Sequence, residues 1–111
     1  MIKWYPELYL DSRTEKQVRR IKKRMEKQKI TISVYCIALA SNSDNLFDIY
    51  HTNEFLFQYY RQKEIKVIGL ASSKESAFLM VADIVNDVYQ QTGKLDVRTF
   101  FQWEESVLDK R

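Results

Sequence analysis

The residue types that most often carry chemistry are scarce in this chain. It has one histidine, His51, one cysteine, Cys36, and two glycines, Gly69 and Gly93. A zinc site built from Cys and His needs several such ligands, and neither glycine lies in a G-x-G-x-x-G or G-x-x-x-x-G-K-S/T phosphate-binding motif. The sequence therefore predicts no metal and no cofactor.

The sequence also gives little support for nucleophilic or metal-dependent catalysis. A catalytic triad would have to use His51, which follows no nucleophile elbow and falls on the polar side of a predicted helix. Cys36 lies within an apolar run, which predicts that its side chain is a small buried part of the core. Glu64-Ile65-Lys66 has the spacing of the E-x-K element of metal-dependent nucleases. Such a nuclease needs another acid on the preceding strand, but Asp44 and Asp48 fall on a predicted helix, so the sequence leans against an enzyme.

The basic residues are concentrated in one segment. Residues 16–29 hold eight Lys or Arg and a single acid, which leaves the rest of the chain with a net charge of −4. In a helix predicted over 12–29, Val18, Ile21 and Met25 form a narrow apolar stripe, and the basic side chains fall opposite it. The basic face consists of Lys16, Arg19, Arg20, Lys23 and Lys27. Such a face suits contacts with nucleic-acid phosphates, and it equally suits a solvated helix surface.

A short internal repeat predicts a duplicated strand-then-helix unit. Residues 37–47 (IALASNSDNLF) and 68–78 (IGLASSKESAF) agree at five of eleven positions, 31 residues apart. Each copy places a serine three residues before an acid, which is the spacing of a capping box. If the two strands are parallel, both turns open on one sheet edge, where small anionic ligands bind in open α/β sheets. The crevice candidates are Ser41, Asn42, Ser43, Ser72 and Ser73. Helix capping alone also accounts for the motif.

The pattern along the chain predicts one α/β domain over residues 1–111. An aromatic extended segment or edge strand over 1–10 precedes the basic helix, because Pro6 disfavours a central strand. A βαβαβ-like core over 30–101 follows, with strands at 30–40 and 65–71 and helices at about 44–62 and 73–91. Residues 95–101 form either a third strand or a short helix capped by Asp96. Residues 102–111 form a tail or short helix. The fold class predicted is a small layered α/β domain with two or three parallel strands.

Apolar side chains outside the predicted core stripes indicate a protein interface. A sheet of two or three strands also leaves edges that need covering. The interface candidates are Phe47, Phe55, Tyr59, Leu79 and Met80. Burial of these side chains within the same monomer is the alternative.

These features predict a non-enzymatic binding or regulatory module that makes protein contacts and self-associates as a homodimer. No apolar stretch approaches the roughly 20 residues that span a membrane, and no N-terminal segment has a signal-peptide pattern, so a cytoplasmic location without membrane contact is expected. One alternative is a nucleic-acid-associated protein that contacts phosphates through the basic helix. The other is binding of a small anionic ligand, or catalysis, at the serine turns.

Overall fold

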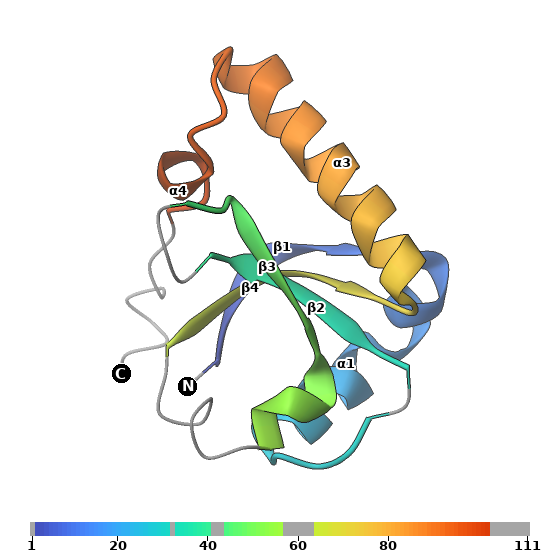
Figure 1. Ribbon diagram of the computed structural model, residues 1–111. Coiled ribbons are helices and arrows are strands. Elements are labelled where there is room, and N and C mark those ends of the chain that lie inside the picture. The colour runs from blue at the N-terminus through green and yellow to red at the C-terminus, as the bar shows by residue number, and fades with distance from the viewer. Residues whose placement is uncertain (1, 32, 41–43, 57–63, 103–111) are drawn as a thin grey trace.

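The computed structural model describes residues 2–31, 33–40, 44–56 and 64–102, with the backbone alone for residues 55 and 56 (Figure 1). These residues form a mixed α/β domain with four strands and three α-helices. The elements are β1 (Ile2–Leu10), α1 (Ser12–Glu26), β2 (Tyr35–Leu39), β3 (Phe47–His51), the 3-10 helix η1 (Thr52–Leu56), β4 (Ile65–Ala71), α3 (Lys74–Thr92) and α4 (Val97–Phe100).

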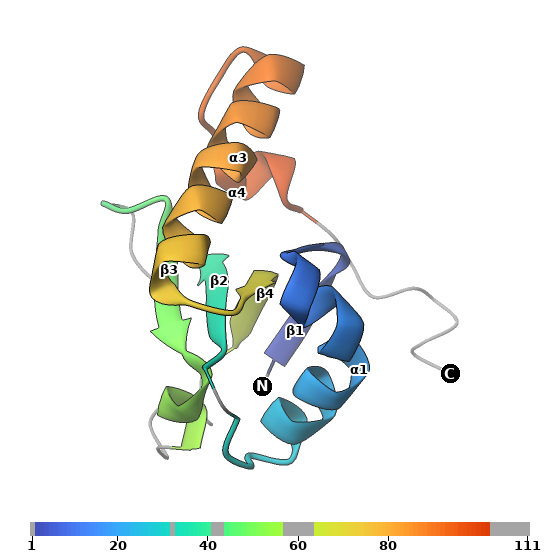
Figure 2. The same ribbon diagram turned by 90° about the vertical axis from the view of Figure 1, so that its right-hand side faces the viewer.

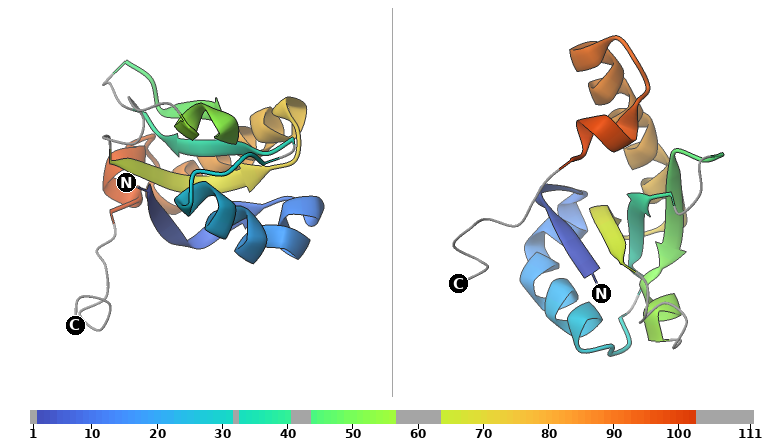
Figure 3. Two further views of the ribbon diagram at one scale, coloured as in Figure 1. Left: turned by 90° about the horizontal axis from the view of Figure 1, so that it is seen from below. Right: turned by 90° about the vertical axis from the view of Figure 1, so that its left-hand side faces the viewer.

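The four strands form one mixed sheet in the order β1-β4-β2-β3. Strands β1 and β4 are parallel, whereas β2 runs antiparallel to both of its neighbours, β4 and β3. Helices α1 and α3 lie on opposite sides of this sheet (Figures 2 and 3). The α/β class is therefore confirmed, but the prediction of a purely parallel sheet of two or three strands is wrong.

Two apolar clusters hold the three layers together. On the α1 side, Ile21 and Met25 pack with Cys36 of β2 and with Val67 and Leu70 of β4. Cys36 is fully buried, as its apolar surroundings predict, and this desolvation raises the pKa of its thiol far above the ordinary value. The lone cysteine is thus part of the core.

The second cluster lies under α3, and its helix face differs from the prediction. Helical spacing predicts a core face made of Ala77, Phe78, Val81, Ala82, Val85, Val88 and Tyr89. Ala77, Met80, Ile84 and Val88 are buried, whereas Phe78, Ala82 and Tyr89 are exposed. Helix α3 is apolar over more than half its circumference, so helical spacing alone fits two overlapping faces. The sheet selects the face that fits between Ile37, Ile68 and Phe101.

The helix predicted over 44–62 is wrong, because this region begins with a strand. Residues Phe47–His51 pair antiparallel with Tyr35–Leu39 in continuous register. Phe47 and Ile49 face the α3 cluster and Tyr50 faces the α1 cluster, so the side chains alternate with the period of a strand. The preceding strand is shorter than predicted and covers only 35–39 of residues 30–40. Residues 57–62 of the predicted helix lie outside the described residues.

The structure decides between the alternatives left open for residues 1–10 and for residues 95–101. β1 is an edge strand, and its register with β4 shifts between Trp4 and Tyr9, around Pro6. After α3 the chain forms α4 instead of a third parallel strand, because the Asp96 side chain accepts hydrogen bonds from the backbone and hydroxyl of Thr99. Gly93 ends α3 with a φ of 72°, the left-handed cap that its position predicts. Residues 103–111 of the predicted tail lie outside the described residues.

The residue after the α1 cap offers a simple stability test. Gln28 has a φ of 57°, a left-handed conformation that favours glycine. We expect Gln28→Gly to raise the free energy of unfolding by about 0.5–1 kcal/mol, because glycine adopts this conformation without a Cβ clash. Urea unfolding measures the difference, with Lys29→Gly as the control that gains nothing. Equal or lower stability of Gln28→Gly would contradict the expectation.

Candidate functional site

A cavity of about 480 Å³ runs along α1. It lies between α1 on one side and the described residues of the segment 30–34 (Ile30, Thr31, Ser33 and Val34) on the other, with Ser72 also in its wall. We call this cavity the α1 groove. Its lining comprises Arg13, Thr14, Gln17, Arg20, Ile21, Arg24, Ile30, Thr31, Ser33, Val34 and Ser72. Three arginines thus line a concave site whose lining includes no acidic residue.

The cations of α1 fall into two matched rows. Arg13, Arg20 and Arg24, seven and four residues apart, all line the α1 groove; we call them the groove row. Lys16, Lys23 and Lys27 repeat this spacing three residues further along the chain and are all exposed; we call them the crest row. The helical geometry of α1 is interrupted at Gln17 (φ −124°, ψ 16°), between the first and second members of each row.

Only part of the predicted basic face lines the groove. Lys16, Lys23 and Lys27 form the crest row, and Arg20 belongs to the groove row. The fifth predicted residue, Arg19, is exposed and belongs to neither row. Arg13 and Arg24 were not among the predicted candidates. Their spacing to Arg20 was the available signal, but only the position of the segment 30–34 shows that this row faces a cavity.

Arg24 is held in place by the opposite wall of the groove. Its Nε donates a hydrogen bond of 2.7 Å to the carbonyl of Ile30, which joins α1 to the start of the segment 30–34. The guanidinium has further N–H groups on its two Nη atoms, and these have no hydrogen-bond acceptor among the described residues. Arg24 therefore presents fixed donors to a ligand in the groove.

One acidic residue of α1, Glu26, lies next to β1. The indole Nε1 of Trp4 donates to Glu26 at 3.2 Å, and the Lys22 ammonium lies 5.2 Å from the centre of the Trp4 ring. Neither Glu26 nor Glu15, the other acid of α1, lines the α1 groove.

A carboxylate at one end of the groove joins α1 to the turn before α3. Asp11 is the N-cap of α1, and its Oδ1 accepts a 2.9 Å hydrogen bond from the Thr14 backbone. The Thr14 hydroxyl lies 2.9 Å from both this oxygen and the Leu70 carbonyl. Its Oδ2 accepts from the backbone and hydroxyl of Ser72 at 2.7 and 2.8 Å and from the Ser76 hydroxyl at 2.7 Å. Burial alone would raise the Asp11 pKa, but these hydrogen bonds outweigh it and hold the pKa well below the usual value of 3.8.

The predicted serine crevice is not formed by the described residues. β2 ends at Leu39 and β4 at Ala71, and since these strands are antiparallel their carboxyl ends lie at opposite ends of the sheet. The α3 cap is Ser73, whose hydroxyl accepts from the Ser76 backbone at 3.0 Å, so the predicted box from Ser72 to Glu75 is also wrong. Ser41, Asn42 and Ser43 lie outside the described residues.

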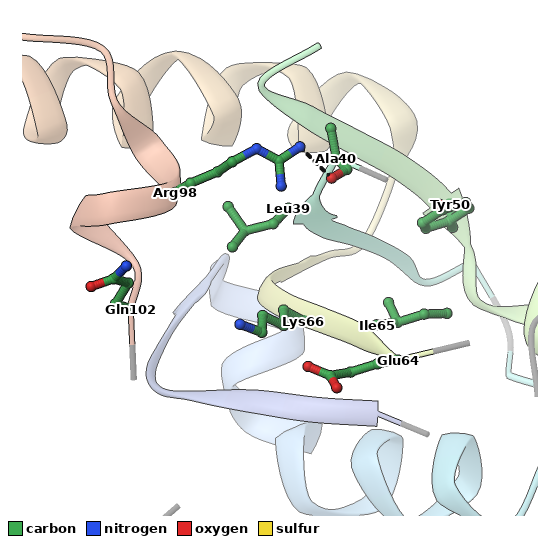
Figure 4. Close-up of a pocket in the computed structure, with 8 residues that line it drawn as sticks. All are labelled: Leu39, Ala40, Tyr50, Glu64, Ile65, Lys66, Arg98 and Gln102. Atoms are coloured by element: carbon green, nitrogen blue, oxygen red, sulfur yellow. Dashed lines mark hydrogen bonds between the residues drawn. The ribbon is translucent and has the colours of Figure 1, made fainter. Parts of the chain in front are cut away.

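A second cavity, of about 340 Å³, lies where the end of β2, the start of β4 and α4 meet (Figure 4). It brings together the charged side chains Glu64, Lys66 and Arg98, and an Arg98 Nη donates to the Ala40 carbonyl at 2.8 Å. Its lining thus mixes both signs of charge, in contrast with the α1 groove.

The nuclease-like element Glu64-Ile65-Lys66 does not gather acids around a metal position. Asp48, although on β3 and not on a helix, accepts a hydrogen bond from the Tyr50 hydroxyl on the α1 side of the sheet. Glu64 and Lys66 line the second cavity together with Tyr50, whereas Asp48 is not among the residues that line it. No group of three His, Cys, Asp or Glu in the described part of the chain could hold a metal ion.

His51 makes contacts that stabilise the fold. It lies on β3, where its Nδ1 accepts a 3.1 Å hydrogen bond from the Asn53 backbone and its ring packs edge-on against Tyr35 at 5.0 Å. The histidine is half-buried, not on the surface of a helix as predicted. The nearby Glu54 carboxylate accepts a 2.8 Å hydrogen bond from the backbone N–H of His51.

The predicted interface residues do not form one patch. Phe47 packs against Phe101, and Met80 is only 7% exposed, whereas Leu79 is 64% exposed. The side chains of Phe55 and Tyr59 lie outside the described residues. An exposed apolar stripe that the prediction assigned to the core runs along α3 instead: Phe78, Ala82 and Tyr89, with half-buried Val85 between them.

No family model matches the chain, and no curated protein or solved structure matches it. Within the described ranges, every helix is too short or too polar to cross a membrane. The α1 groove is the described feature with the clearest chemical preference, because all the charged residues in its concave lining are arginines.

Proposed function

We propose that the protein binds nucleic acid through phosphates held along α1. The observation that carries this proposal is the groove row: three arginines that line one concave site without an acidic neighbour in the lining. Guanidinium groups bind phosphate oxygens through paired, charge-assisted hydrogen bonds. The crest row extends the same positive surface onto the exposed side of the helix.

The extent of the cations favours a polyanion over an isolated phosphate. Arg13 and Arg24 lie near opposite ends of α1, on either side of the break in helical geometry at Gln17, and the crest row covers a similar length of chain. Several phosphates of one strand can therefore meet cations at once. Each phosphate neutralised releases counterions, so affinity should fall steeply as salt rises.

Fluorescence anisotropy with labelled single-stranded and duplex oligonucleotides, at low and near-physiological salt, tests the proposal. We expect low-salt binding that weakens steeply with salt and falls by at least about tenfold in Arg20→Glu/Lys23→Glu. The control Lys74→Glu/Lys94→Glu makes the same change in net charge at exposed positions outside α1 and should retain most of the affinity. Absence of binding at low salt, or equal losses in both double variants, would overturn the proposal.

Self-association is a second candidate function, favoured by the edge strand β3. The bonds from Ala40 N–H to the Leu46 carbonyl and from Thr52 N–H to the Val34 carbonyl place the even-numbered residues of β3 against β2. The backbone groups of Phe47 and Ile49 therefore point outward from the sheet, and such edges pair readily with another strand. The exposed stripe of α3 adds apolar surface for a second copy.

Analytical ultracentrifugation over a wide concentration range tests self-association. We expect a concentration-dependent mass that returns to that of a monomer in Phe78→Ser/Tyr89→Ser, since both side chains are more than half exposed. Gln90→Ser serves as a control on the same helix. A wild-type protein that stays monomeric at all concentrations would contradict this second function and leave nucleic-acid binding unaffected.

A further inference from the structure

We infer that the α1 groove selects single-stranded nucleic acid over duplex, an inference that rests on the proposed function. The two cation rows have the same number of charges and the same spacing, but they differ in chemistry and in surroundings. We therefore expect the two rows to contact different parts of a nucleic acid.

The groove row consists only of arginine and the crest row only of lysine. An arginine guanidinium is planar, so it can stack on a nucleobase as well as bind a phosphate, whereas a lysine ammonium acts as a point charge. The crest row therefore suits any phosphate backbone. The groove row suits a strand whose bases are exposed.

The size of the groove suits a single nucleotide better than a paired helix. A volume of about 480 Å³ is typical of a pocket for a small organic molecule. Duplex DNA keeps its bases stacked inside, and only its backbone could reach the groove mouth. A single strand can turn an unstacked nucleotide into such a cavity without the loss of base pairing.

The interior of the groove has apolar surface for that nucleotide. Ile21 and Val34 are buried at its inner side, and Ile30, at 60% exposure, offers apolar surface on the opposite wall. Arg24 is fixed to that wall through the Ile30 carbonyl, so cation and apolar surface occur side by side. A base can thus cover apolar side chains while its phosphate meets a guanidinium.

The matched rows allow a direct test. Arg13→Gln/Arg20→Gln and Lys16→Gln/Lys23→Gln remove the same charge, at positions seven residues apart in both pairs, and both leave the Arg24 to Ile30 contact intact. Anisotropy is measured with one single-stranded oligonucleotide and with the duplex of the same sequence, over a range of salt. Circular dichroism melts verify that both variants fold.

We expect the wild-type protein to bind the single strand about tenfold more tightly than the duplex. The groove-row variant should lose about tenfold or more of its single-strand affinity and with it the preference. The crest-row variant should weaken on both ligands by similar factors and keep the preference.

Equal affinity of the wild-type protein for both ligands, or tighter binding of duplex, would overturn the selectivity while the proposed function stands. So would a groove-row variant that keeps the preference. Failure to bind either nucleic acid at low salt would remove the proposed function itself.

Discussion

Replacement of Asp11 by alanine is expected to lower the free energy of unfolding by about 3 kcal/mol. The loss of an N-cap accounts for about 1 kcal/mol of this. The remainder arises because four donors, the backbone N–H groups of Thr14 and Ser72 and the hydroxyls of Ser72 and Ser76, lose the carboxylate that they share. Urea unfolding followed by circular dichroism measures the difference from the wild-type protein.

Two further variants separate this network from a general charge effect. Asp11→Asn keeps one carbonyl oxygen as an acceptor and should lose less stability than Asp11→Ala, about 1–2 kcal/mol. Glu7→Ala removes an exposed acid from β1 and should change stability by less than about 0.5 kcal/mol. If Asp11→Ala were no less stable than Glu7→Ala, the link between α1 and the turn before α3 would contribute nothing.

The same carboxylate makes stability depend on acid pH. Because the folded-state pKa of Asp11 lies below its usual value of 3.8, the unfolded chain binds the proton first as pH falls. The stabilisation by Asp11 is fully present above about pH 4 to 5 and is lost progressively as pH falls toward the lowered pKa. Unfolding of Asp11→Asn should therefore be less sensitive to pH in this range, which urea titrations at pH 3 to 6 measure. Parallel pH profiles for the two proteins would contradict the assignment.

Replacement of Phe101 by alanine should lower the free energy of unfolding by about 3–5 kcal/mol, the range for an aromatic side chain removed from a core. Phe101 is fully buried, and its ring contacts Tyr5 of the edge strand β1 and Phe47 of the opposite edge strand β3. Its loss thus leaves a cavity beneath both edges of the sheet.

Phe100 provides the matched control for Phe101. It is the same residue type one position earlier, but it is only half-buried, so Phe100→Ala should have a clearly smaller effect. Thermal unfolding of both variants compares the two. If Phe100→Ala and Phe101→Ala lost equal stability, the burial of Phe101 after α4 would not be the source of the effect.

Local signals in the sequence were sufficient to predict the ends of helices that are capped by neighbouring residues. Asp11 and Gly93 are caps that act within one turn, so the start of α1 and the end of α3 could be predicted. Residues 44–56 could not, because their strand depends on pairing with β2 and their apolar positions also fit helical spacing. Non-local pairing likewise reversed the direction of β2 relative to β4 and separated the two serine turns.

The candidate site was predictable only in part for the same reason. The charge of α1 is evident from the chain, but the concave wall opposite Arg13 and Arg24 comes from residues 30–34, which the prediction placed in a strand. A helical projection identifies the two rows of cations and does not indicate which row faces a cavity. That assignment requires the position of the segment that follows the helix.

The most direct test of nucleic-acid binding in the α1 groove is a titration of isotope-labelled protein with a short single-stranded oligonucleotide, followed by amide chemical shifts. We predict the largest shifts at the amides of the two groove walls, in residues 13–24 and in Thr31, Ser33 and Val34, with little change in β3 and α3. Shifts concentrated on β3 and α3, or around Lys66 and Arg98 in the second cavity, would contradict the account.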